Sequence, residues 1–198
     1  MANPRPAIVV AGQPVQSGAY FLRIDVARPI RLCFGAAAGG AAVLVPAGDY
    51  VYAGSAMGQR GPAALASRLL RHAVRSAARP PHSIYTQMLV AFEGCGLVGR
   101  APQRKTVHWH VDYLLDHPAA TLDTVCALRS LRRLERDLAE LLEADTATFP
   151  VIPGLGASDH VGHTHLLGVT ADAAWWQSVL AAATALADCS AKPGSPPG

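Results

Sequence analysis

The 198-residue sequence has no uninterrupted apolar segment long enough to cross a lipid bilayer. Its longest apolar runs, such as residues 36–46, are short and rich in glycine, whereas a membrane-spanning helix needs about 20 apolar residues. Charged residues make up only 16% of the chain and hydrophobic residues 51%, which excludes a chain that is disordered overall. We therefore expect a globular protein, of a length that suits one domain with a substantial core and no membrane partner.

Cysteine is scarce, and its spacing excludes the common zinc and disulfide scaffolds. The four cysteines lie far apart and form no CxxC pair, so neither a zinc ribbon nor a disulfide framework is indicated. The N-terminal segment lacks the charged start and long apolar core of a signal peptide. Free thiols without a signal peptide predict a cytoplasmic protein.

Acidic residues are absent from residues 50–92, although the whole chain has a net charge of only +3. A helix expected from Gly61-Pro62 to about residue 78 would carry the basic groups of this stretch on one stripe, at spacings of three and four residues. These groups are Arg68, Arg71, His72, Arg75 and Arg79. Arginines on one helical face are suited to a nucleic-acid backbone, and a solvated basic face is the alternative.

The hydrophobic pattern predicts an α+β fold with a mixed central sheet flanked by helices. Alternation indicates a strand over residues 18–26 with a hairpin partner over 30–34, and further strands over 42–45, 50–53 and 108–114. A long helix is expected from Thr121 or Asp123 to about Glu143, followed by a strand over 165–169 and a helix over 172–187. One domain over 17–189 is expected between disordered tails at 1–16 and 190–198, and residues 79–106 have no firm periodicity.

Two candidates for chemistry lie within these expected elements. Glu135 shares a helical face with leucines, so it is either a metal ligand or general base, or it reaches solvent or pairs with an arginine. Tyr20 and Tyr52 would lie side by side if their strands pair. A tyrosine on a strand is commonly a core residue, and it acts as an acid or base only where neighbouring cations lower its pKa.

Histidines and carboxylates form a further polar cluster. Their side chains either bind a transition metal or hydrogen-bond loops and hold them closed. The members of this cluster are His108, His110, Asp112, Ser158, Asp159, His160, His163 and His165. No zinc motif of standard spacing is present, so the sequence leaves both interpretations open.

Two short segments resemble the halves of the GIY-YIG motif: Gly18-Ala19-Tyr20 and Tyr52-Ala53-Gly54. The segment YVYAGSA over residues 50–56 is similar to the YVYVGSA form found in a GIY-YIG-like branch of uncharacterised proteins, some of them fused to endonuclease III. HWHVDYLL over residues 108–115 resembles the HWHIDYLL of that branch. The ordered motifs also include residues 68–72, Glu135 and 154–159, and they span residues 18–168.

This resemblance to the GIY-YIG-like nuclease superfamily implies a metal-dependent endonuclease that hydrolyses phosphodiester bonds in nucleic acid, with DNA expected. Tyr20 would be the leading general base with Tyr52 in support, and Arg68 would contact the scissile phosphate. Glu135 would bind Mg²⁺ or Mn²⁺, because a metal ion and an arginine both offset the charge that grows on the reacting phosphate. Further nucleic-acid contacts would come from Arg71, His72, Arg75 and Arg79. These assignments predict that the side chains of Tyr20, Tyr52, Arg68 and Glu135 converge.

The sequence also departs from the branch it resembles. Residues 79–106 are an insertion relative to the branch, and cysteines common there are replaced by Arg136, His160 and Gly162. Two alternatives therefore stay open. One is a nucleic-acid-binding module that keeps the fold without cutting, and the other is a structural metal-binding domain built on His160, His163 and His165.

Overall fold

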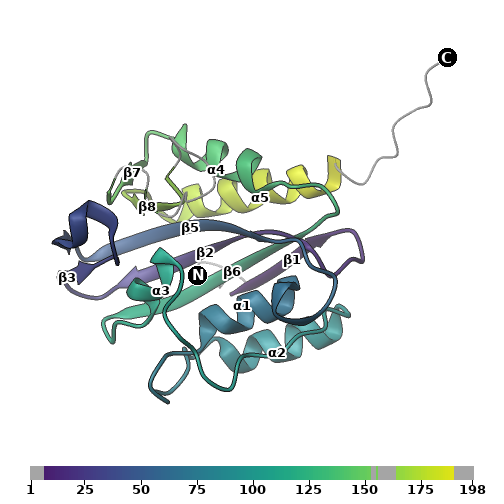
Figure 1. The fold of residues 1–198 in the computed structure, drawn as a ribbon. Helices are drawn as coiled ribbons and strands as arrows, with labels where there is room; N and C mark the ends of the chain where they lie inside the picture. Colours follow the sequence, from purple (N-terminus) through teal and green to yellow (C-terminus); the bar gives the residue numbers. More distant parts are fainter. Residues whose placement is uncertain (1–6, 153–154, 156–163, 190–198) are drawn as a thin grey trace, which may run out of the picture.

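A six-stranded mixed sheet forms the centre of the computed structural model, which describes residues 7–152, 155 and 164–189 (Figure 1). The strands follow the order β1-β6-β2-β5-β8-β7. Their bounds are β1 (Ile8–Gly12), β2 (Gly18–Val26), β5 (Gly48–Ala56), β6 (Ala120–Arg129), β7 (Thr148–Pro150) and β8 (Leu166–Val169). The pair β1–β6 is parallel and the other pairs are antiparallel. The predicted α+β fold with a mixed sheet is confirmed.

Helices cover both faces of this sheet (Figure 1). One face carries α1 (Leu65–Ala73), α2 (Tyr85–Gly94) and α3 (His110–Leu115), and the other carries α4 (Glu135–Glu143) and α5 (Ala173–Cys189). Alternation along β2 separates the two cores, because Tyr20 and Leu22 pack with α1 whereas Ala19 and Phe21 pack with α4 and α5. Residues 18–22 of β2 are buried on both faces and apolar, whereas Arg23 is partly exposed and Asp25 is exposed.

Several predicted elements are wrong in the structure. Residues 110–115 form the helix α3 where a strand over 108–114 was predicted, and β6 occupies the start of the predicted long helix. The helix was predicted from leucines at helical spacing, and this spacing continues from β6 through a loop into α4. Leu131 lies in that loop and is 65% exposed, so it does not belong to a buried helical face. The short strands β3 (Ile30–Cys33) and β4 (Ala42–Val45) pair with each other, so residues 30–34 are not the hairpin partner of β2.

The N-terminal segment differs from expectation, and the predicted insertion contains a helix. Residues Ile8–Gly12 pair with β6 as β1, so the prediction of a disordered tail over 1–16 is wrong for this strand. Residues 1–6 and 190–198 lie outside the described residues. Residues 79–106 contain α2, which packs against α1 and buries Met88 and Phe92. This stretch is therefore part of the core on the α1 face of the sheet.

The helices of the described chain show no membrane-spanning character. Within residues 7–152, 155 and 164–189, no helix combines the length and the hydropathy that a bilayer crossing requires. The four cysteines are free thiols, of which Cys126 is buried in the sheet.

Candidate active site

The pairing of β2 with β5 brings the two halves of the tyrosine motif together. Tyr20 lies opposite Gly54, and Leu22 lies opposite Tyr52. The two tyrosines are therefore diagonal neighbours on one face, with ring centroids 6.3 Å apart. A Cβ atom on Gly54 would lie 2.6 Å from the Tyr20 hydroxyl oxygen. The glycine of the second half thus makes room for the tyrosine of the first.

The Tyr20 hydroxyl is bonded to a buried histidine of α1. Its oxygen lies 2.8 Å from Nε2 of His72, and Nδ1 of His72 lies 3.5 Å from Oδ1 of Asp112 on α3. A carboxylate facing Nδ1 favours the tautomer that carries its proton there, which leaves Nε2 free to accept the Tyr20 proton. Tyr20 is thus hydrogen-bonded to His72, and the Asp112 carboxylate faces the other side of the imidazole without a hydrogen bond to Nδ1.

Burial sets the charge states of these groups. Burial, followed by the neighbouring Tyr52, raises the pKa of Tyr20 well above 10, against the opposing charge of Arg68. Burial also lowers the pKa of His72 to about 4 despite its contact with Asp112. For Asp112, burial acts to raise the pKa, but contact with His72 and the charges of Lys105 and Arg71 hold it well below its usual range. At neutral pH, the Tyr20 phenol and the His72 imidazole are therefore neutral and the Asp112 carboxylate is charged.

Asp112 is the centre of a buried ionic network. Nη1 of Arg71 lies 2.9 Å from both of its oxygens, and Nζ of Lys105 lies 3.3 Å from Oδ1. Oδ2 also accepts hydrogen bonds from the backbone N–H groups of His108 and Trp109, which precede α3. Asp112 therefore fixes the start of α3, the position of Arg71 and the orientation of His72 together.

Two arginines of α1 lie against the ring of Trp109. The guanidinium carbon of Arg68 is 4.6 Å from the ring centroid, and that of Arg71 is 4.2 Å from it. Nη1 of Arg68 donates to the backbone carbonyl of Ser55 at 2.7 Å. Stacking on the indole and this bond to β5 hold the Arg68 guanidinium next to the paired tyrosines.

Glu135 reaches the same place from the opposite helical layer. It is the first residue of α4, and its Oε2 accepts a hydrogen bond from the Ser55 hydroxyl. Its Oε1 lies 3.4 Å from Nδ1 of His165, and its side chain is 26% exposed. A half-exposed carboxylate fits Mg²⁺ or Mn²⁺, because these ions use few protein ligands and complete their shells with water and phosphate oxygens.

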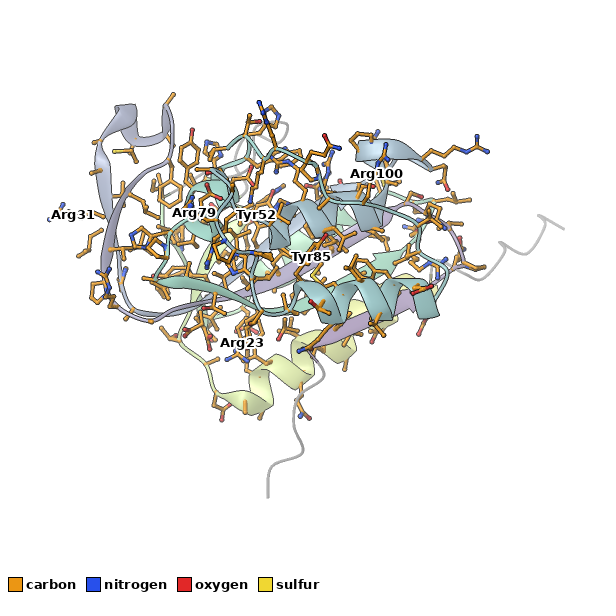
Figure 2. All side chains as sticks on the ribbon, turned by 90° about the horizontal axis from the view of Figure 1, so that it is seen from below. Arg23, Arg31, Tyr52, Arg79, Tyr85 and Arg100 are labelled. Atoms are coloured by element: carbon orange, nitrogen blue, oxygen red, sulfur yellow. The ribbon has the colours of Figure 1, made fainter. Side chains whose placement is uncertain are left out.

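Tyr20 lies beside Tyr52 in the structure, and the prediction that the side chains of Tyr20, Tyr52, Arg68 and Glu135 converge on one pocket stays a prediction. Ser55 links Arg68 to Glu135 through its carbonyl and its hydroxyl, and the His72 ring lies 6.0 Å from that of Tyr52 and 5.6 Å from that of Trp109. In Figure 2, Tyr52 lies on the α1 side of the sheet, whereas Arg23 lies beside α5, where it stacks on Trp176.

The prediction of one continuous basic helical face is wrong. The helix α1 ends at Ala73, and His72 is fully buried beneath it. Arg75 donates to the carbonyls of Leu115 and Ala120, and Arg79 pairs with Asp116 at 2.8 Å. The backbone carbonyls of Leu115 and Ala120 therefore occupy the guanidinium group of Arg75, and the carboxylate of Asp116 occupies that of Arg79. Arg71 is engaged with Asp112, as described above.

The predicted histidine cluster divides into parts. Ser158, Asp159, His160 and His163 lie outside the described residues. His165 lies beside Glu135, whereas His108 and His110 lie at the start of α3 and Asp112 is buried. The shared strand face predicted for His108, His110 and Asp112 is wrong, because these residues start a helix. Among the residues that the structure describes, no three His, Cys, Asp or Glu side chains form a metal-binding group.

Sequence reasoning missed four contributors to the site. The sequence patterns did not point to Ser55, Trp109 or Lys105 as site residues. They predicted that His72 contacts nucleic acid, whereas in the structure His72 contacts Tyr20. The spacing of four residues between Arg68 and His72 places both on one side of α1, which was the available signal for His72. The partners of Lys105 and Trp109 come from distant elements, so periodicity could not identify them.

Comparison with known proteins gives one informative result. Residues 19–187 match the model of a family described as a domain of unknown function, DUF123. No curated protein and no solved structure matches the chain.

Proposed function

The chain belongs to the DUF123 family, and we propose that it is a metal-dependent endonuclease that hydrolyses phosphodiester bonds in nucleic acid, with DNA as the expected substrate. The observation that carries the proposal is the position of Ser55, whose carbonyl accepts a hydrogen bond from Arg68 and whose hydroxyl donates to Glu135. Ser55 lies on β5, next to Gly54, which pairs with Tyr20 of β2, and Tyr20 is bonded to His72. A phenol with a proton acceptor, a fixed guanidinium and a half-exposed carboxylate together supply what phosphodiester hydrolysis requires.

Tyr20 supplies the general base through His72. A buried phenol with a raised pKa holds its proton, so it cannot take one from water unless it passes its own proton on. In the proposed step, the Tyr20 oxygen accepts a proton from the attacking water as the Tyr20 proton moves to Nε2 of His72, 2.8 Å away. The Asp112 carboxylate then stabilises the imidazolium, as a carboxylate does in other catalytic relays.

Arg68 supplies charge for the phosphate. Its guanidinium is held by the Ser55 carbonyl and the Trp109 ring, so it needs little rearrangement when charge grows on the phosphate oxygens. Preorganised donors of this kind are typically worth 10²–10³ in rate. The neighbouring Arg71 adds positive potential while its own carboxylate partner stays in place.

Glu135 is the residue that would hold Mg²⁺ or Mn²⁺, with Ser55 and His165 orienting its carboxylate. When bound, such an ion would neutralise charge on the phosphate and assist the departing oxygen. Its position at the start of α4 places the carboxylate across β5 from Arg68, because both contact Ser55.

Cleavage of a panel of labelled substrates tests the proposal. The panel contains single-stranded, duplex, flapped and abasic DNA and a structured RNA, each with Mg²⁺ or Mn²⁺ and with EDTA. The wild-type protein is expected to cut at least one DNA only when metal is present. Glu135→Gln and Arg68→Ala are expected to reduce that rate by about 10²-fold or more.

Glu93→Gln is the matched control, because Glu93 is an exposed carboxylate on α2 that lies away from Ser55. It is expected to cut at the wild-type rate. Absence of cutting on every substrate, with salt-sensitive binding retained, would refute the enzyme and favour a binding module. Equal rates for Glu135→Gln and wild type would refute the assigned site.

A further inference from the structure

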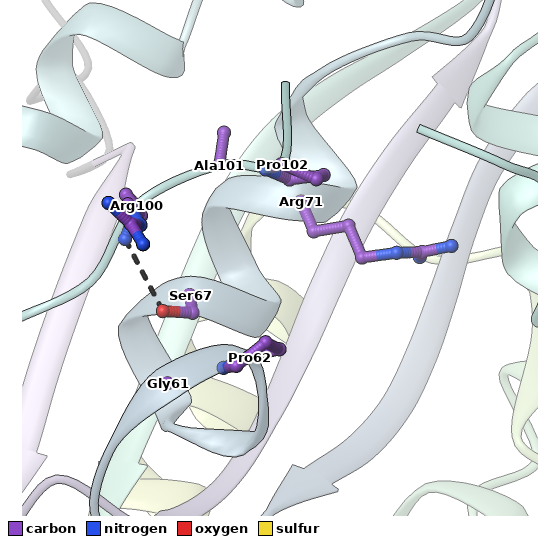
Figure 3. Close-up of a pocket in the computed structure, with 7 residues that line it drawn as sticks. All are labelled: Gly61, Pro62, Ser67, Arg71, Arg100, Ala101 and Pro102. Atoms are coloured by element: carbon purple, nitrogen blue, oxygen red, sulfur yellow. Dashed lines mark hydrogen bonds between the residues drawn. The ribbon is translucent and has the colours of Figure 1, made fainter. Parts of the chain in front are cut away.

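Three adjoining hollows run between α1 and the segment of residues 98–106. The first has a volume of about 560 Å³ and is lined in part by Arg60, Ser67 and Arg100. The second, of about 160 Å³, shares Ser67 and Arg100 with the first and adds Arg71 (Figure 3). The third, of about 600 Å³, shares Pro102 with the second and adds Arg104. The first two hollows share Gly61, Ser67 and Arg100, and the third adjoins the second at Pro102, beyond the end of α1. We refer to this row of hollows as the groove.

Specific contacts build the far wall of this groove. A Cβ atom on Gly99 would lie 2.4 Å from the backbone nitrogen of Ser67, so this segment contacts α1 directly. The Ser67 hydroxyl accepts the backbone N–H of Arg100 at 3.3 Å (Figure 3). Gln16 bonds the carbonyl of Gly96 and the N–H of Val98, each at 2.8 Å. The segment is therefore held in place, and the groove is a defined feature of the fold.

The groove carries uncompensated positive charge. Arg60, Arg100 and Arg104 are exposed, and within the described chain none of their side chains forms an ion pair. The described residues that line these three hollows include no Asp or Glu, and Glu93 lines a fourth hollow that shares Val98 and Gly99 with the first. Arg79, in contrast, is paired with Asp116. Arginines that lack a carboxylate partner and share one concave surface indicate a polyanionic ligand.

The groove leads to the candidate active site. Arg71 lines the second hollow, and its guanidinium lies on the same Trp109 ring as that of Arg68. A chain of phosphates in the groove would therefore pass from Arg100 and Arg71 to Arg68. The planar guanidinium matches two phosphate oxygens at once, which favours phosphodiesters over the carboxylates of an acidic protein along a continuous track.

We infer that this groove binds the sugar–phosphate backbone of the nucleic-acid strand cut at Arg68, through Arg60, Arg100 and Arg104. The inference rests on the proposed function, because it takes the substrate class from that site. The predicted Arg75 and Arg79 also line the third hollow, but their guanidinium groups are bonded to Leu115, Ala120 and Asp116, so the phosphate contacts are assigned to Arg60, Arg100 and Arg104. Contacts to phosphates position the strand without reading its bases, so the groove binds without sequence preference.

Binding measured by fluorescence anisotropy tests the inference. Fluorescein-labelled single-stranded and duplex DNA and a labelled RNA are titrated in EDTA over a range of salt concentrations. The variant Arg60→Ala/Arg100→Ala is compared with Arg28→Ala/Arg31→Ala, which removes the same charge from exposed positions. In Figure 2, Arg31 lies at the opposite end of the molecule from Arg100. Arg104→Ala is then added to the first pair.

The groove pair is expected to weaken binding at least tenfold and to reduce the slope of log K against log salt by about 1.5, since each phosphate contact contributes about 0.7–0.9. Adding Arg104→Ala should reduce the slope further, whereas Arg28→Ala/Arg31→Ala should leave it near the wild-type value. Equal slopes for both pairs would overturn the inference. The inference would also be overturned if the wild-type protein bound polyglutamate in preference to DNA and RNA, which bound no better than control ligands, and if the groove pair lost the polyglutamate binding.

Cleavage assays separate this inference from the proposed function. With a cut substrate, the groove pair is expected to raise KM and leave kcat near wild type, whereas Arg68→Ala lowers kcat. Groove-dependent binding without any cleavage would support the groove and contradict the nuclease. Normal binding and normal KM in the groove pair, with cleavage intact, would overturn the groove alone.

Discussion

Tyr20 illustrates how single residues acquire chemistry from their surroundings. The same residue type occurs at Tyr50 on a neighbouring strand, where the hydroxyl donates to the carbonyl of Pro46 and has no titratable partner. Burial raises the pKa of Tyr50 to about 12 and raises that of Tyr20 as well. What distinguishes Tyr20 is His72, 2.8 Å from its oxygen, so its neighbour defines its function.

Gly54→Ala is expected to damage the site through one added methyl group. Its Cβ would lie 2.6 Å from the Tyr20 hydroxyl and 2.7 Å from the ring carbon that carries it. The tyrosine must move, which costs about 1–3 kcal/mol of stability and breaks its bond to His72. Urea denaturation and cleavage assays measure both effects. Gly94→Ala is the control, because no atom lies within 4 Å of its added Cβ; if Gly54→Ala were equally neutral, the close packing would be contradicted.

Two buried histidines predict a loss of stability in mild acid. Burial, together with the charge of Arg75 for His82, lowers the pKa of His72 to about 4 and that of His82 to about 3, against 6.5 for free histidine. The unfolded chain therefore binds more protons than the folded chain between pH 6.5 and about 4. The free energy of unfolding should fall as the pH is lowered through this window, by about 1.4 kcal/mol per pH unit for each histidine.

Urea denaturation at pH 7 and pH 5 measures this slope. His82→Gln is expected to reduce the pH dependence even though it lowers stability at both pH values, because it removes one proton-binding group. Nδ1 of His82 accepts the N–H of Leu122, and protonation would end that bond. A slope unchanged by His82→Gln would show that this histidine is not the source.

Among the secondary-structure elements, the site depends on the helix α3, which the sequence pattern predicts as a strand. Alternation over residues 108–114 predicts a strand, yet Asp112 accepts the N–H groups of His108 and Trp109 and caps a helix. In contrast, β2 was predictable because Tyr20, Leu22, Ile24 and Val26 alternate along it, and a strand was also expected over residues 50–53 of β5. Lys105 and Arg71 could not be paired with Asp112 from sequence, since that pairing depends on how α1 and α3 pack.

Asp112→Asn is expected to destabilise the protein by about 3–5 kcal/mol, because it removes the carboxylate that pairs with Arg71 and with buried Lys105, which keeps only the longer contact to Asp116 at 3.7 Å. Thermal and urea denaturation measure the loss. Asp188→Asn, at an exposed position near the end of α5, is expected to change stability by less than about 0.5 kcal/mol. Similar stabilities for the two variants would refute the ionic centre.

The two faces of the sheet contribute unequally to the candidate site. The face with α1–α3 holds Tyr20, Tyr52 and His72, whereas the face with α4 and α5 contributes Glu135 at the start of α4, beside an apolar core. The sequence predicts an α+β architecture because its strands and helices alternate along the chain. It could not predict the order β1-β6-β2-β5-β8-β7, because β6 is buried on both faces and β1 comes from a segment rich in proline and glycine.

Matched truncations on the two faces test this difference. Leu128→Ala, facing α4 and α5, and Leu69→Ala, on α1 beside Arg68, both remove fully buried side chains. Each is expected to cost about 2–5 kcal/mol of stability. At a temperature where both variants are folded, Leu128→Ala should keep the wild-type kcat and Leu69→Ala should lower it. Equal kcat values would contradict the unequal contribution of the two faces.

Cleavage by Tyr20→Phe, compared with Tyr50→Phe, tests the central claim most directly. Both changes remove one buried hydroxyl from the same core, but only the Tyr20 hydroxyl contacts His72. On a DNA that the wild-type protein cuts, we predict that Tyr20→Phe lowers kcat by about 10²–10⁴-fold with DNA binding retained, while Tyr50→Phe cuts at the wild-type rate. Cleavage by Tyr20→Phe at the wild-type rate would contradict the account.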